Sequence, residues 1–312
     1  MPWTVADIPD QTGRTVVVTG ANSGLGLITC RELARRGARV IMTARDTAKG
    51  ELAADGIRSA VPSAQVEVAA LDLADLASVR EFAGAFDTLA PDGLDLLVNN
   101  AGVMAVPRRT TADGFELQFG TNHLGHFALT GLLLPALLRR TAPRVVTVSS
   151  GVHKAGRMNF DDLQGEKRYR KWGAYAQSKL ANLLFAFELD RRAEGSALVS
   201  LAAHPGYAST NLQGVGPAMS GSKAAAWVVG LGNSVLAQSA DMGALPQLYA
   251  ATSPEARGGT YIGPDRLFEQ RGHPKVVSST KAARDPKSAE RLWRASEELT
   301  GIHYPDTFLT TE

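Results

Sequence analysis

The chain has 312 residues, of which 44% are hydrophobic and 21% are charged, and its formal net charge is +2. This profile is typical of a soluble globular protein with a large core. No stripe of lysine and arginine with interleaved aromatic residues occurs, which argues against nucleic acid as a partner. The single cysteine, Cys30, excludes an internal disulfide and fits a reducing compartment.

The sequence predicts no targeting or membrane-spanning segment. Met1–Asp7 contains proline and aspartate where a signal peptide would have a basic and then an apolar run. The most apolar later run, Ala224 to Ala237, is interrupted by glycines and is too short to cross a bilayer. We therefore expect a cytoplasmic protein in which residues 1–12 form an N-terminal arm and residues 13–312 form a single domain.

Strand-like apolar runs alternate with helix-like segments along the chain. The runs are hydrophobic throughout, which indicates strands that are covered on both faces. This alternation predicts an α/β fold with a doubly wound parallel sheet between two helical layers. The predicted strands are Thr15–Thr19, Arg39–Thr43, Val66–Ala70, Leu94–Val98, Arg144–Val148 and Leu198–Ala202.

Two helices have clear boundaries in the sequence. The segment Leu25–Arg36 is amphipathic and is closed by Gly37. The last helix starts at the N-cap Asp285, which a proline follows, and continues to Leu299 before Gly301 ends it.

The alternation of strands and helices breaks between about residues 211 and 245. This region follows a Pro-Gly turn, so an insertion here would lie over the carboxyl ends of the strands, where ligands bind in such folds. We expect it to form a substrate lid. Its apolar residues, among them Met219 and Trp227, favour an apolar or amphipathic substrate over a sugar.

A glycine-rich turn from Thr19 to Gly26 joins the first strand to the first helix. Glycines allow the backbone to approach a pyrophosphate, and the N-terminus of a helix offers free N–H groups and a positive dipole. The strand–turn–helix context predicts a dinucleotide site, although the spacing differs from GxGxxG. The expected contacts are Gly20, Asn22, Ser23, Gly24, Leu25 and Gly26.

The end of the second strand bears on the choice between NAD and NADP. In NAD-binding sheets an acid at this place binds the ribose 2′-hydroxyl, whereas an arginine suits a 2′-phosphate. Ala44 stands where the acid is expected and Arg45 follows it, so NADP is the expected cofactor and NAD is the alternative. Asp46 complicates this choice unless it caps the next helix.

Two further strand ends carry residues that suit a nucleotide. Asp72, which Leu73 follows, lies just past the third strand and could accept a hydrogen bond from the adenine amine. The small residues of Asn100, Ala101 and Gly102 would let the loop after the fourth strand pass close to the cofactor. A plain tight turn is the alternative interpretation of that loop.

Tyr175 and Lys179 are four residues apart, so they would share one face of a helix. A tyrosine loses its proton near pH ~10, and a neighbouring cation lowers that pKa. The pair therefore suits acid–base chemistry at a carbonyl or an alcohol. Because the same spacing also occurs on solvated helices, the surrounding motifs decide its meaning.

Together these motifs resemble the short-chain dehydrogenase/reductase family over essentially the whole sequence. The match includes the TGxxxGxG turn, the Leu-Asp-Leu and Asn-Asn-Ala-Gly segments, the Val-Ser-Ser strand end, Tyr-x-x-x-Lys and a later Pro-Gly, in the family's order. The separation of Ser150 from Tyr175 is similar to that in the branch of retinol dehydrogenases, WW-domain oxidoreductase and protochlorophyllide reductases. The resemblance implies a Rossmann-type fold in a single domain.

The resemblance implies a catalytic tetrad of Asn122, Ser150, Tyr175 and Lys179, with Ser149 as the alternative serine. Tyr175 would exchange a proton with the substrate, and Ser150 would donate to the developing alkoxide. Lys179 would lower the pKa of Tyr175 and bind the nicotinamide ribose. Asn122 would hold a water that links Lys179 to solvent, and the hydride would come from the cofactor.

The resemblance also implies a loop beside the nicotinamide, formed by Pro205 and Gly206, with Thr210 as a contact to the carboxamide or a phosphate. His123 and His126 are spaced like a metal pair, but no nearby cysteine or second carboxylate completes a site. We therefore expect no metal and interpret both histidines as packing or hydrogen-bonding residues.

The sequence thus predicts an NADP-dependent oxidoreductase that transfers a hydride between nicotinamide and a carbonyl or alcohol. One alternative is a carbon–carbon double-bond reductase of the protochlorophyllide reductase type, but its active-site cysteine is missing, since Cys30 lies on the cofactor-side helix. Another is a regulatory nucleotide-binding module, which would not need an intact tetrad. Many relatives pair through the helices that carry Asn122 and Tyr175, so a homodimer or homotetramer is an open expectation.

Overall fold

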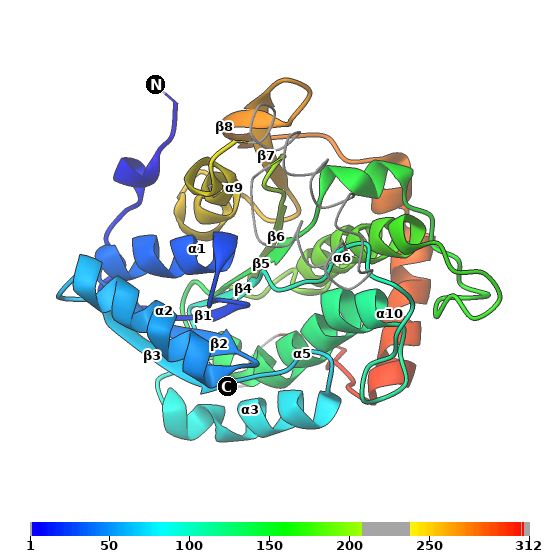
Figure 1. The fold of residues 1–312 in the computed structure, drawn as a ribbon, viewed down its shortest axis with the longest axis horizontal. Coiled ribbons are helices and arrows are strands. Elements are labelled where there is room, and N and C mark those ends of the chain that lie inside the picture. Colours follow the sequence, from blue (N-terminus) through cyan, green and yellow to red (C-terminus); the bar gives the residue numbers. More distant parts are fainter. Residues whose placement is uncertain (1, 208–237, 307, 309–312) are drawn as a thin grey trace.

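The strands of the chain assemble into one sheet at the centre of the molecule (Figure 1). The computed structural model describes residues 2–207, 238–306 and 308. Within these residues eight strands lie in the order β3-β2-β1-β4-β5-β6-β7-β8, in which β8 alone is antiparallel to its neighbour. The strands are β1 (Thr15–Thr19), β2 (Arg39–Ala44), β3 (Gln65–Ala70), β4 (Leu96–Asn99), β5 (Arg144–Val148), β6 (Val199–Ala203), β7 (Tyr261–Arg266) and β8 (Arg271–Val276).

Helices cover both faces of the sheet and complete the predicted three-layer architecture (Figure 1). One face is covered by α1 (Gly24–Arg35), α2 (Thr47–Ala60) and α9 (Ala240–Thr252). The other is covered by α3 (Leu76–Leu89), α5 (Gly125–Leu138) and α6 (Lys171–Arg192). The remaining elements are α4 (Leu117–Phe119), α10 (Pro286–Thr300), the π-helical turn η2 (Gly120–Leu124) and the 3-10 turns η1 (Val5–Asp7), η3 (Gly151–Ala155) and η4 (Lys281–Arg284).

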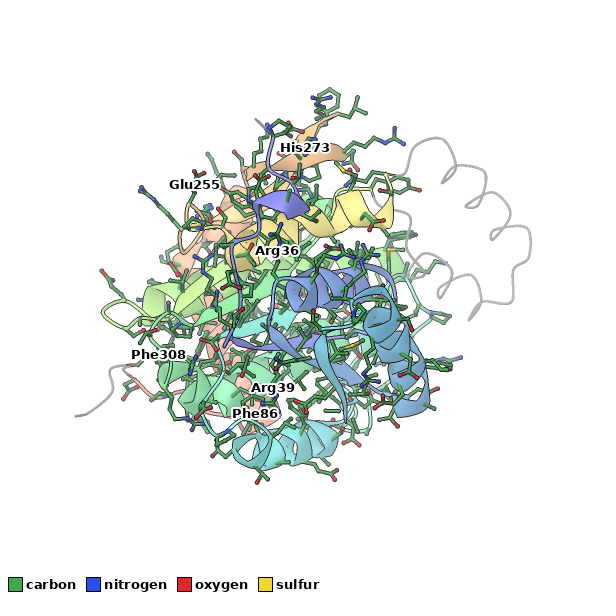
Figure 2. The ribbon with its side chains drawn as sticks, turned by 90° about the vertical axis from the view of Figure 1, so that its left-hand side faces the viewer. Arg36, Arg39, Phe86, Glu255, His273 and Phe308 are labelled. Atoms are coloured by element: carbon green, nitrogen blue, oxygen red, sulfur yellow. The ribbon has the colours of Figure 1, made fainter. Side chains whose placement is uncertain are left out.

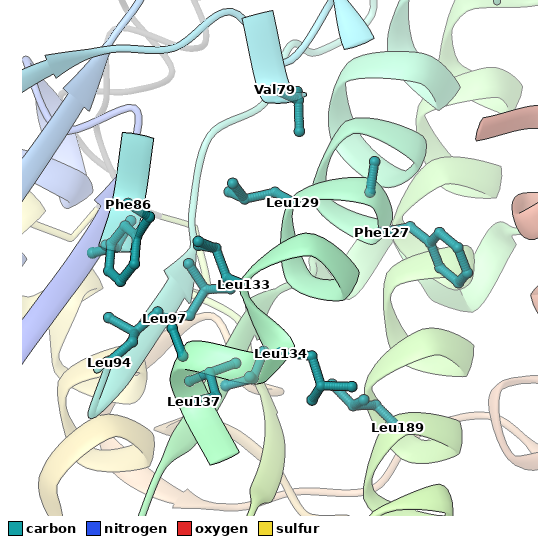
Figure 3. Close-up of a cluster of buried hydrophobic side chains, with 14 of the residues drawn as sticks. Val79, Phe86, Leu94, Leu97, Phe127, Leu129, Leu133, Leu134, Leu137 and Leu189 are labelled. Carbon is teal, nitrogen blue, oxygen red and sulfur yellow. The ribbon is translucent and has the colours of Figure 1, made fainter. Parts of the chain in front are cut away.

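The largest hydrophobic core lies between the sheet and helices α3, α5 and α6. Leu97 of β4 lies in one cluster with Leu133 and Leu137 of α5 and with Phe86 of α3 (Figure 3). Helix α5 is buried around most of its circumference, which explains why its sequence is almost wholly apolar. Each fully buried side chain of this kind contributes about 1.5–3 kcal/mol, so the start of α5 is held firmly in place.

Helix α10 and the residues after it pack against the outer side of α5 and α6. The ring of Trp293 lies 5.2 Å from that of Phe127 and 5.8 Å from that of Phe185. The Tyr304 hydroxyl donates a hydrogen bond of 2.8 Å to the Phe127 carbonyl oxygen. A Cβ on Gly131 would lie 2.8 Å from the Tyr304 ring, so glycine is required for this close approach.

The observed strands agree with the predicted ones to within two residues at each end. Two caps are also confirmed, because Asp46 accepts the Lys49 N–H over 3.1 Å at the start of α2, and Asp285 caps α10. Gly301 ends α10 in the left-handed conformation, with φ 66°. Cys30 is fully buried on α1, and burial raises the pKa of its thiol.

Residues 2–12, which the sequence predicts as an N-terminal arm, lie against α1, α9 and β8. Trp3 packs edge-on against Tyr249, with ring centroids 5.3 Å apart, and its carbonyl oxygen is 3.0 Å from His273 Nδ1. Arg36 donates to two carbonyl oxygens of η1. Figure 2 shows this segment between the labelled Arg36 and His273.

Candidate active site

A pocket of about 400 Å³ opens at the carboxyl ends of β1 to β4. The strand order changes direction here, because β2 and β4 lie on opposite sides of β1, and ligands of doubly wound sheets bind at such a point. The pocket brings together most residues that the sequence predicts for the cofactor. They are Gly20, Asn22, Ser23, Gly24, Leu25, Arg45, Asp72, Leu73, Asn100, Ala101 and Gly102.

The turn after β1 stays close to the sheet because Gly26 has no side chain. A Cβ at Gly26 would lie 2.6 Å from Asn100 Nδ2, which donates to the Thr19 carbonyl oxygen over 2.8 Å. Helix α1 begins at Gly24, and the side chain of its N-cap Ser23 makes no capping hydrogen bond. The first N–H groups of α1 therefore stay available at the pocket, as binding of an anion at a helix N-terminus requires.

The end of β2 places cations on the rim of the pocket. Arg45 is exposed, and among the residues that the structure describes it forms no ion pair. The Asp46 carboxylate pairs with Lys49 Nζ at 2.9 Å and caps α2; hydrogen bonds from the Lys49 side chain and backbone hold the pKa of Asp46 below its ordinary value. Asp46 is thus engaged by Lys49, whereas the Arg45 guanidinium is available to a ligand.

Asn122 holds the loop that follows β4. Its Oδ1 accepts the Val103 N–H over 2.8 Å, and its Nδ2 donates to the Val103 carbonyl oxygen and to Ser178 Oγ, each over 2.9 Å. The residue is fully buried within η2. Because both Nδ2 hydrogens are used, a water at Asn122 would have to bind Oδ1 or the main-chain carbonyl.

Gly102 brings this loop beside the residues predicted for catalysis. A Cβ at Gly102 would lie 3.0 Å from Asn122 Oδ1 and 3.6 Å from Lys179 Nζ. The pocket wall and the predicted catalytic residues are therefore in direct proximity. Asp72, on the opposite side of the pocket, is fixed by the Ala74 N–H, which donates to its Oδ1 over 2.9 Å.

The two serines after β5 have different surroundings. Ser149 is 2% exposed, and its Oγ donates to the Lys179 carbonyl oxygen over 2.7 Å. Ser150 is partly exposed, caps η3 and lowers the pKa of the neighbouring Tyr175 through its side chain. His153 Nδ1 lies 2.7 Å from the Ser150 carbonyl oxygen and fixes the turn that presents this serine.

Tyr175 and Lys179 lie one turn apart on α6, and both are buried. Lys179 Nζ donates to the Val148 carbonyl oxygen over 3.0 Å and lies 5.8 Å from the centroid of the Tyr175 ring. Burial raises the pKa of Tyr175 to about 12, although the hydrogen bond with Ser150 lowers it. Burial lowers the pKa of Lys179 to about 8. The net shift of Tyr175 is thus opposite to the one expected from a neighbouring lysine, because desolvation of the phenolate dominates.

The predicted nicotinamide loop lies past the end of β6. The Gln238 side chain donates to the Pro205 carbonyl oxygen over 2.8 Å, and the Gly206 N–H donates to His204 Nδ1 over 3.3 Å. Thr210 and most of the predicted lid lie outside the described residues. The last part of the predicted lid, from residue 240 to 245, forms the start of α9.

Trp172 is a residue of the site that the sequence reasoning missed. It lies on the first turn of α6, is 53% exposed, and its ring meets that of Tyr175 edge-on with centroids 6.2 Å apart. The sequence could have indicated Trp172, because it lies three residues before Tyr175 and residues at this spacing share a helix face. Lys49, which lines the pocket from the first turn of α2, was missed too, although it follows closely after Arg45 in the sequence.

The two central histidines make internal contacts. His123 and His126 are each 1% exposed, and burial lowers their pKa values to about 3 and about 4. His123 Nε2 lies 2.9 Å from Ser296 Oγ on α10. Across residues 2–207, 238–306 and 308, no group of three or more His, Cys, Asp or Glu side chains could hold a metal ion, and no helix is long and apolar enough to cross a membrane.

The chain belongs to the short-chain dehydrogenase family, whose model, described as short chain dehydrogenase, matches residues 14–219. That span covers the glycine turn, the loop after β4 and the Tyr175–Lys179 pair. The protein is therefore an oxidoreductase that acts on CH–OH or C=O groups with a nicotinamide cofactor and a small-molecule substrate.

Its relatives include several retinol dehydrogenases. Human retinol dehydrogenase 13 is 43% identical over 296 residues, which cover 94% of this chain and 86% of that protein. Human retinol dehydrogenase 12 is 44% identical over 295 residues, which cover 94% of this chain and 88% of that protein.

Solved structures share the fold. An uncharacterised protein from Mycobacterium paratuberculosis is 50% identical with a TM-score of 0.80, and the match covers 98% of this chain and all of that one. A short-chain dehydrogenase from Shigella flexneri in complex with NADP is 23% identical with a TM-score of 0.61, over 82% of this chain and 97% of that one. At this identity the second likeness shows the fold alone.

Proposed function

We propose that the protein is an NADP-dependent oxidoreductase that transfers a hydride between nicotinamide and a carbonyl or alcohol of an apolar or amphipathic small molecule. The observation that carries the cofactor preference is the exposed Arg45 guanidinium on the rim of the pocket. A guanidinium binds phosphate through parallel charge-assisted hydrogen bonds. Asp46 is engaged by Lys49, and Ala44 offers no carboxylate to a ribose hydroxyl.

The residues of the pocket fit such a dinucleotide. Gly26 keeps the turn after β1 tight, and the uncapped N-terminus of α1 suits a pyrophosphate. Asp72 would accept a hydrogen bond from the adenine amine, while the Asn100–Gly102 loop would lie along the nicotinamide half. Lys179, which Gly102 approaches closely, would bind the nicotinamide ribose.

An apolar substrate is supported by Trp172 and by the relatives. The half-exposed indole stands beside Tyr175 and would provide an apolar wall next to the proton donor. Relatives named retinol dehydrogenases are 43–44% identical over nearly the whole chain. A retinoid-like aldehyde or alcohol is therefore the first substrate class to test.

When bound, NADP supplies or accepts the hydride. In reduction, the Tyr175 hydroxyl would give its proton to the carbonyl oxygen, and a raised pKa keeps that proton available at neutral pH. Ser150 would donate a hydrogen bond to the developing alkoxide. Lys179 and Asn122 would return a proton to Tyr175 from solvent. Ser149 would not take part, since its hydroxyl already donates to the main chain of Lys179.

Steady-state turnover with a panel of carbonyls tests this proposal. Oxidation of NADPH and of NADH is followed with all-trans-retinal, decanal and glyceraldehyde, and the products are identified by mass spectrometry. We expect the two apolar aldehydes to be reduced to alcohols, with NADPH preferred over NADH. Preference for NADH would reject the cofactor assignment. Tight NADPH binding without turnover of any of these carbonyls would favour the regulatory module, and a dihydroretinal that keeps its aldehyde group as product would favour the double-bond reductase.

A further inference from the structure

One buried histidine links the pocket to the helix that carries Asn122, and the proposed reaction does not use it. His126 lies on the first turn of α5 and is 1% exposed. Its Nε2 is 2.8 Å from Thr19 Oγ1, at the end of β1. Its Nδ1 is 3.0 Å from the carbonyl oxygen of Asn122, one turn earlier. The imidazole thus bridges two segments that are far apart in the sequence.

The hydrogen-bond partners fix the proton of His126. A carbonyl oxygen can only accept, so Nδ1 carries the hydrogen that bonds to Asn122. Nε2 is then an acceptor, and the Thr19 hydroxyl must donate to it. Burial lowers the pKa of His126 to about 4, which agrees with a neutral ring at physiological pH.

The Thr19 hydroxyl is oriented from its other side by the loop after β4. The N–H groups of Asn100 and Ala101 both donate to Thr19 Oγ1, each over 2.9 Å. These contacts occupy the two lone pairs, so one hydrogen is left to donate. His126 Nε2 at 2.8 Å is a closer acceptor than the Val98 carbonyl oxygen at 3.3 Å.

The loop after β4 is consequently held at two points that His126 connects. Thr19 holds its beginning, through Asn100 and Ala101, and Asn122 holds Val103 with two hydrogen bonds. Between the two points lies Gly102, which lines the pocket and approaches Lys179. A shift of this loop would be transmitted to Asn122 through both paths.

Asn122 also needs support because its segment departs from α-helical geometry. In the π-helical turn η2 the Gly125 N–H bonds to the Gly120 carbonyl oxygen, five residues back. Such turns are rare and often lie at functional sites. The bond from His126 Nδ1 braces the Asn122 carbonyl at this irregular turn.

We propose that His126 is a positioning residue that couples occupation of the dinucleotide pocket to the placement of Asn122. The coupling runs from the Asn100–Ala101 backbone through the Thr19 hydroxyl and the neutral imidazole to the Asn122 main chain. This inference rests on the proposed function, because it assigns the loop to cofactor binding and Asn122 to proton delivery.

The test compares three replacements of His126. In His126→Gln the side-chain amide oxygen can reach the position of Nε2 and accept from Thr19. In His126→Asn the shorter amide can keep the bond to the Asn122 carbonyl but cannot reach Thr19. His126→Leu removes both bonds. The measurements are the Kd of NADPH by fluorescence titration, kcat and KM for an aldehyde, and the urea midpoint.

We expect His126→Asn and His126→Leu to raise the NADPH Kd and to lower kcat, each by about tenfold, as for loss of a buried hydrogen bond. His126→Gln should keep the Kd within about threefold of the parent value, because it keeps the bond to Thr19, but should lower kcat, because it loses the bond to the Asn122 carbonyl. His123→Gln is the matched control, since His123 is equally buried on the same segment but contacts Ser296. It should lower the urea midpoint without changing the Kd.

Thr19 gives an independent check if His126→Leu does not fold. Thr19→Ser keeps the hydroxyl and should bind NADPH normally, whereas Thr19→Val should weaken binding at least as much as His126→Asn does, because it also removes the acceptor of the Asn100 and Ala101 N–H groups. Adding His126→Asn to Thr19→Val should give no further loss of affinity, because the same chain of hydrogen bonds is already broken.

Two results would overturn the inference. One is that the Asn and Leu variants lose stability but keep the parent Kd and kcat, which is the behaviour of a plain core histidine. The other is that His126→Gln binds NADPH no better than His126→Asn. The Kd comparisons in both results do not depend on the substrate, because the Kd is measured without one. If the parent protein binds NADPH but reduces no carbonyl, the proposed function fails while the Kd comparison still decides the coupling.

Discussion

The proposed dinucleotide pocket at β1–β4 and the proposed catalytic corner, defined by Asn122, Ser150, Tyr175 and Lys179, are built in different ways. The pocket relies on glycines, on the backbone N–H groups at the start of α1 and on an exposed arginine. The catalytic corner buries a phenol and an amine, and burial moves their pKa values in opposite directions, to about 12 and about 8. The pocket thus depends on close backbone approach, while the corner holds ionisable groups in a costly environment.

Apart from the link through His126, this difference implies that the two regions should respond separately to mutation. Changes in the catalytic corner should affect turnover and stability, and changes on the pocket rim should affect cofactor choice.

The largest expected effect is that of Tyr175→Phe. Loss of the proton donor should reduce kcat by about 10³-fold, while the Kd of NADPH stays within about twofold. Steady-state kinetics and fluorescence titration measure the two; a matching loss of affinity would mean that Tyr175 belongs to the pocket.

Arg45→Asp should act on the pocket alone. Replacing the guanidinium by a carboxylate removes the partner of the 2′-phosphate and repels it, so the NADPH/NADH ratio of kcat/KM should fall by about 100-fold. Arg58→Asp, at a partly exposed position of α2 where Arg58 pairs with Glu51 and Asp55, is the matched control and should leave the ratio unchanged. An unaltered ratio in Arg45→Asp would reject the assignment of the 2′-phosphate.

Lys179→Met tests whether the catalytic corner costs stability. Burial lowers the pKa of Lys179 from 10.5 to about 8, so the folded protein binds a proton here less readily than the unfolded chain does. At pH 7 the substitution should raise the free energy of unfolding by about 1–3 kcal/mol while abolishing turnover.

The gain in the free energy of unfolding from Lys179→Met should decrease as the pH rises. Between pH 8 and 10.5 the unfolded parent chain binds more protons at this lysine than the folded one, so parent stability rises with pH in this window. The advantage of Lys179→Met should therefore shrink above pH 8. Urea unfolding at pH 7, 8, 9 and 10 measures it, and a constant difference would contradict the buried, weakly basic amine.

Trp172→Ala should have the smallest effect of these substitutions. It tests whether Trp172 belongs to the catalytic corner or to the dinucleotide pocket. Removing the indole beside Tyr175 should raise KM for all-trans-retinal by about tenfold, through lost apolar contact, and change KM for glyceraldehyde little. Trp172→Phe should restore most of the affinity. Equal changes for both aldehydes, or a changed Kd for NADPH, would argue against a substrate-facing role.

The pocket could be predicted from the sequence because its determinants are local. The order of strand, glycine turn and helix identified Gly20 to Gly26, and strand ends identified Arg45 and Asp72. By contrast, β7 and β8 were not predicted, since Gly263, Pro264, Gly272 and Pro274 interrupt them. In the structure β7 pairs with β6, and β8 pairs with β7. These long-range contacts, which the sequence does not reveal, stabilise the two strands despite their unfavourable residues.

The sequence predicted which residues would form the proposed catalytic corner, but it did not predict their pKa shifts. The Tyr175–Lys179 spacing indicated a lowered tyrosine pKa, yet burial reverses the shift. Depth of burial depends on how α6 packs between the sheet and α10, which no short motif encodes. The choice between Ser149 and Ser150 likewise depends on contacts across the fold, such as the bond of Ser149 to the Lys179 carbonyl.

The covering of α5 and α6 by α10 has a consequence for self-association. These are the helices through which many relatives form pairs, and their outer side is here sealed by Trp293 and Tyr304 from the same chain. Arg192 also covers this surface, with its guanidinium 4.3 Å from the Trp293 ring centroid. A second copy could reach α5 only after displacing α10 and the residues that follow it. The face of α5 and α6 that would meet a second copy in such a pair is therefore occupied by residues of the same chain.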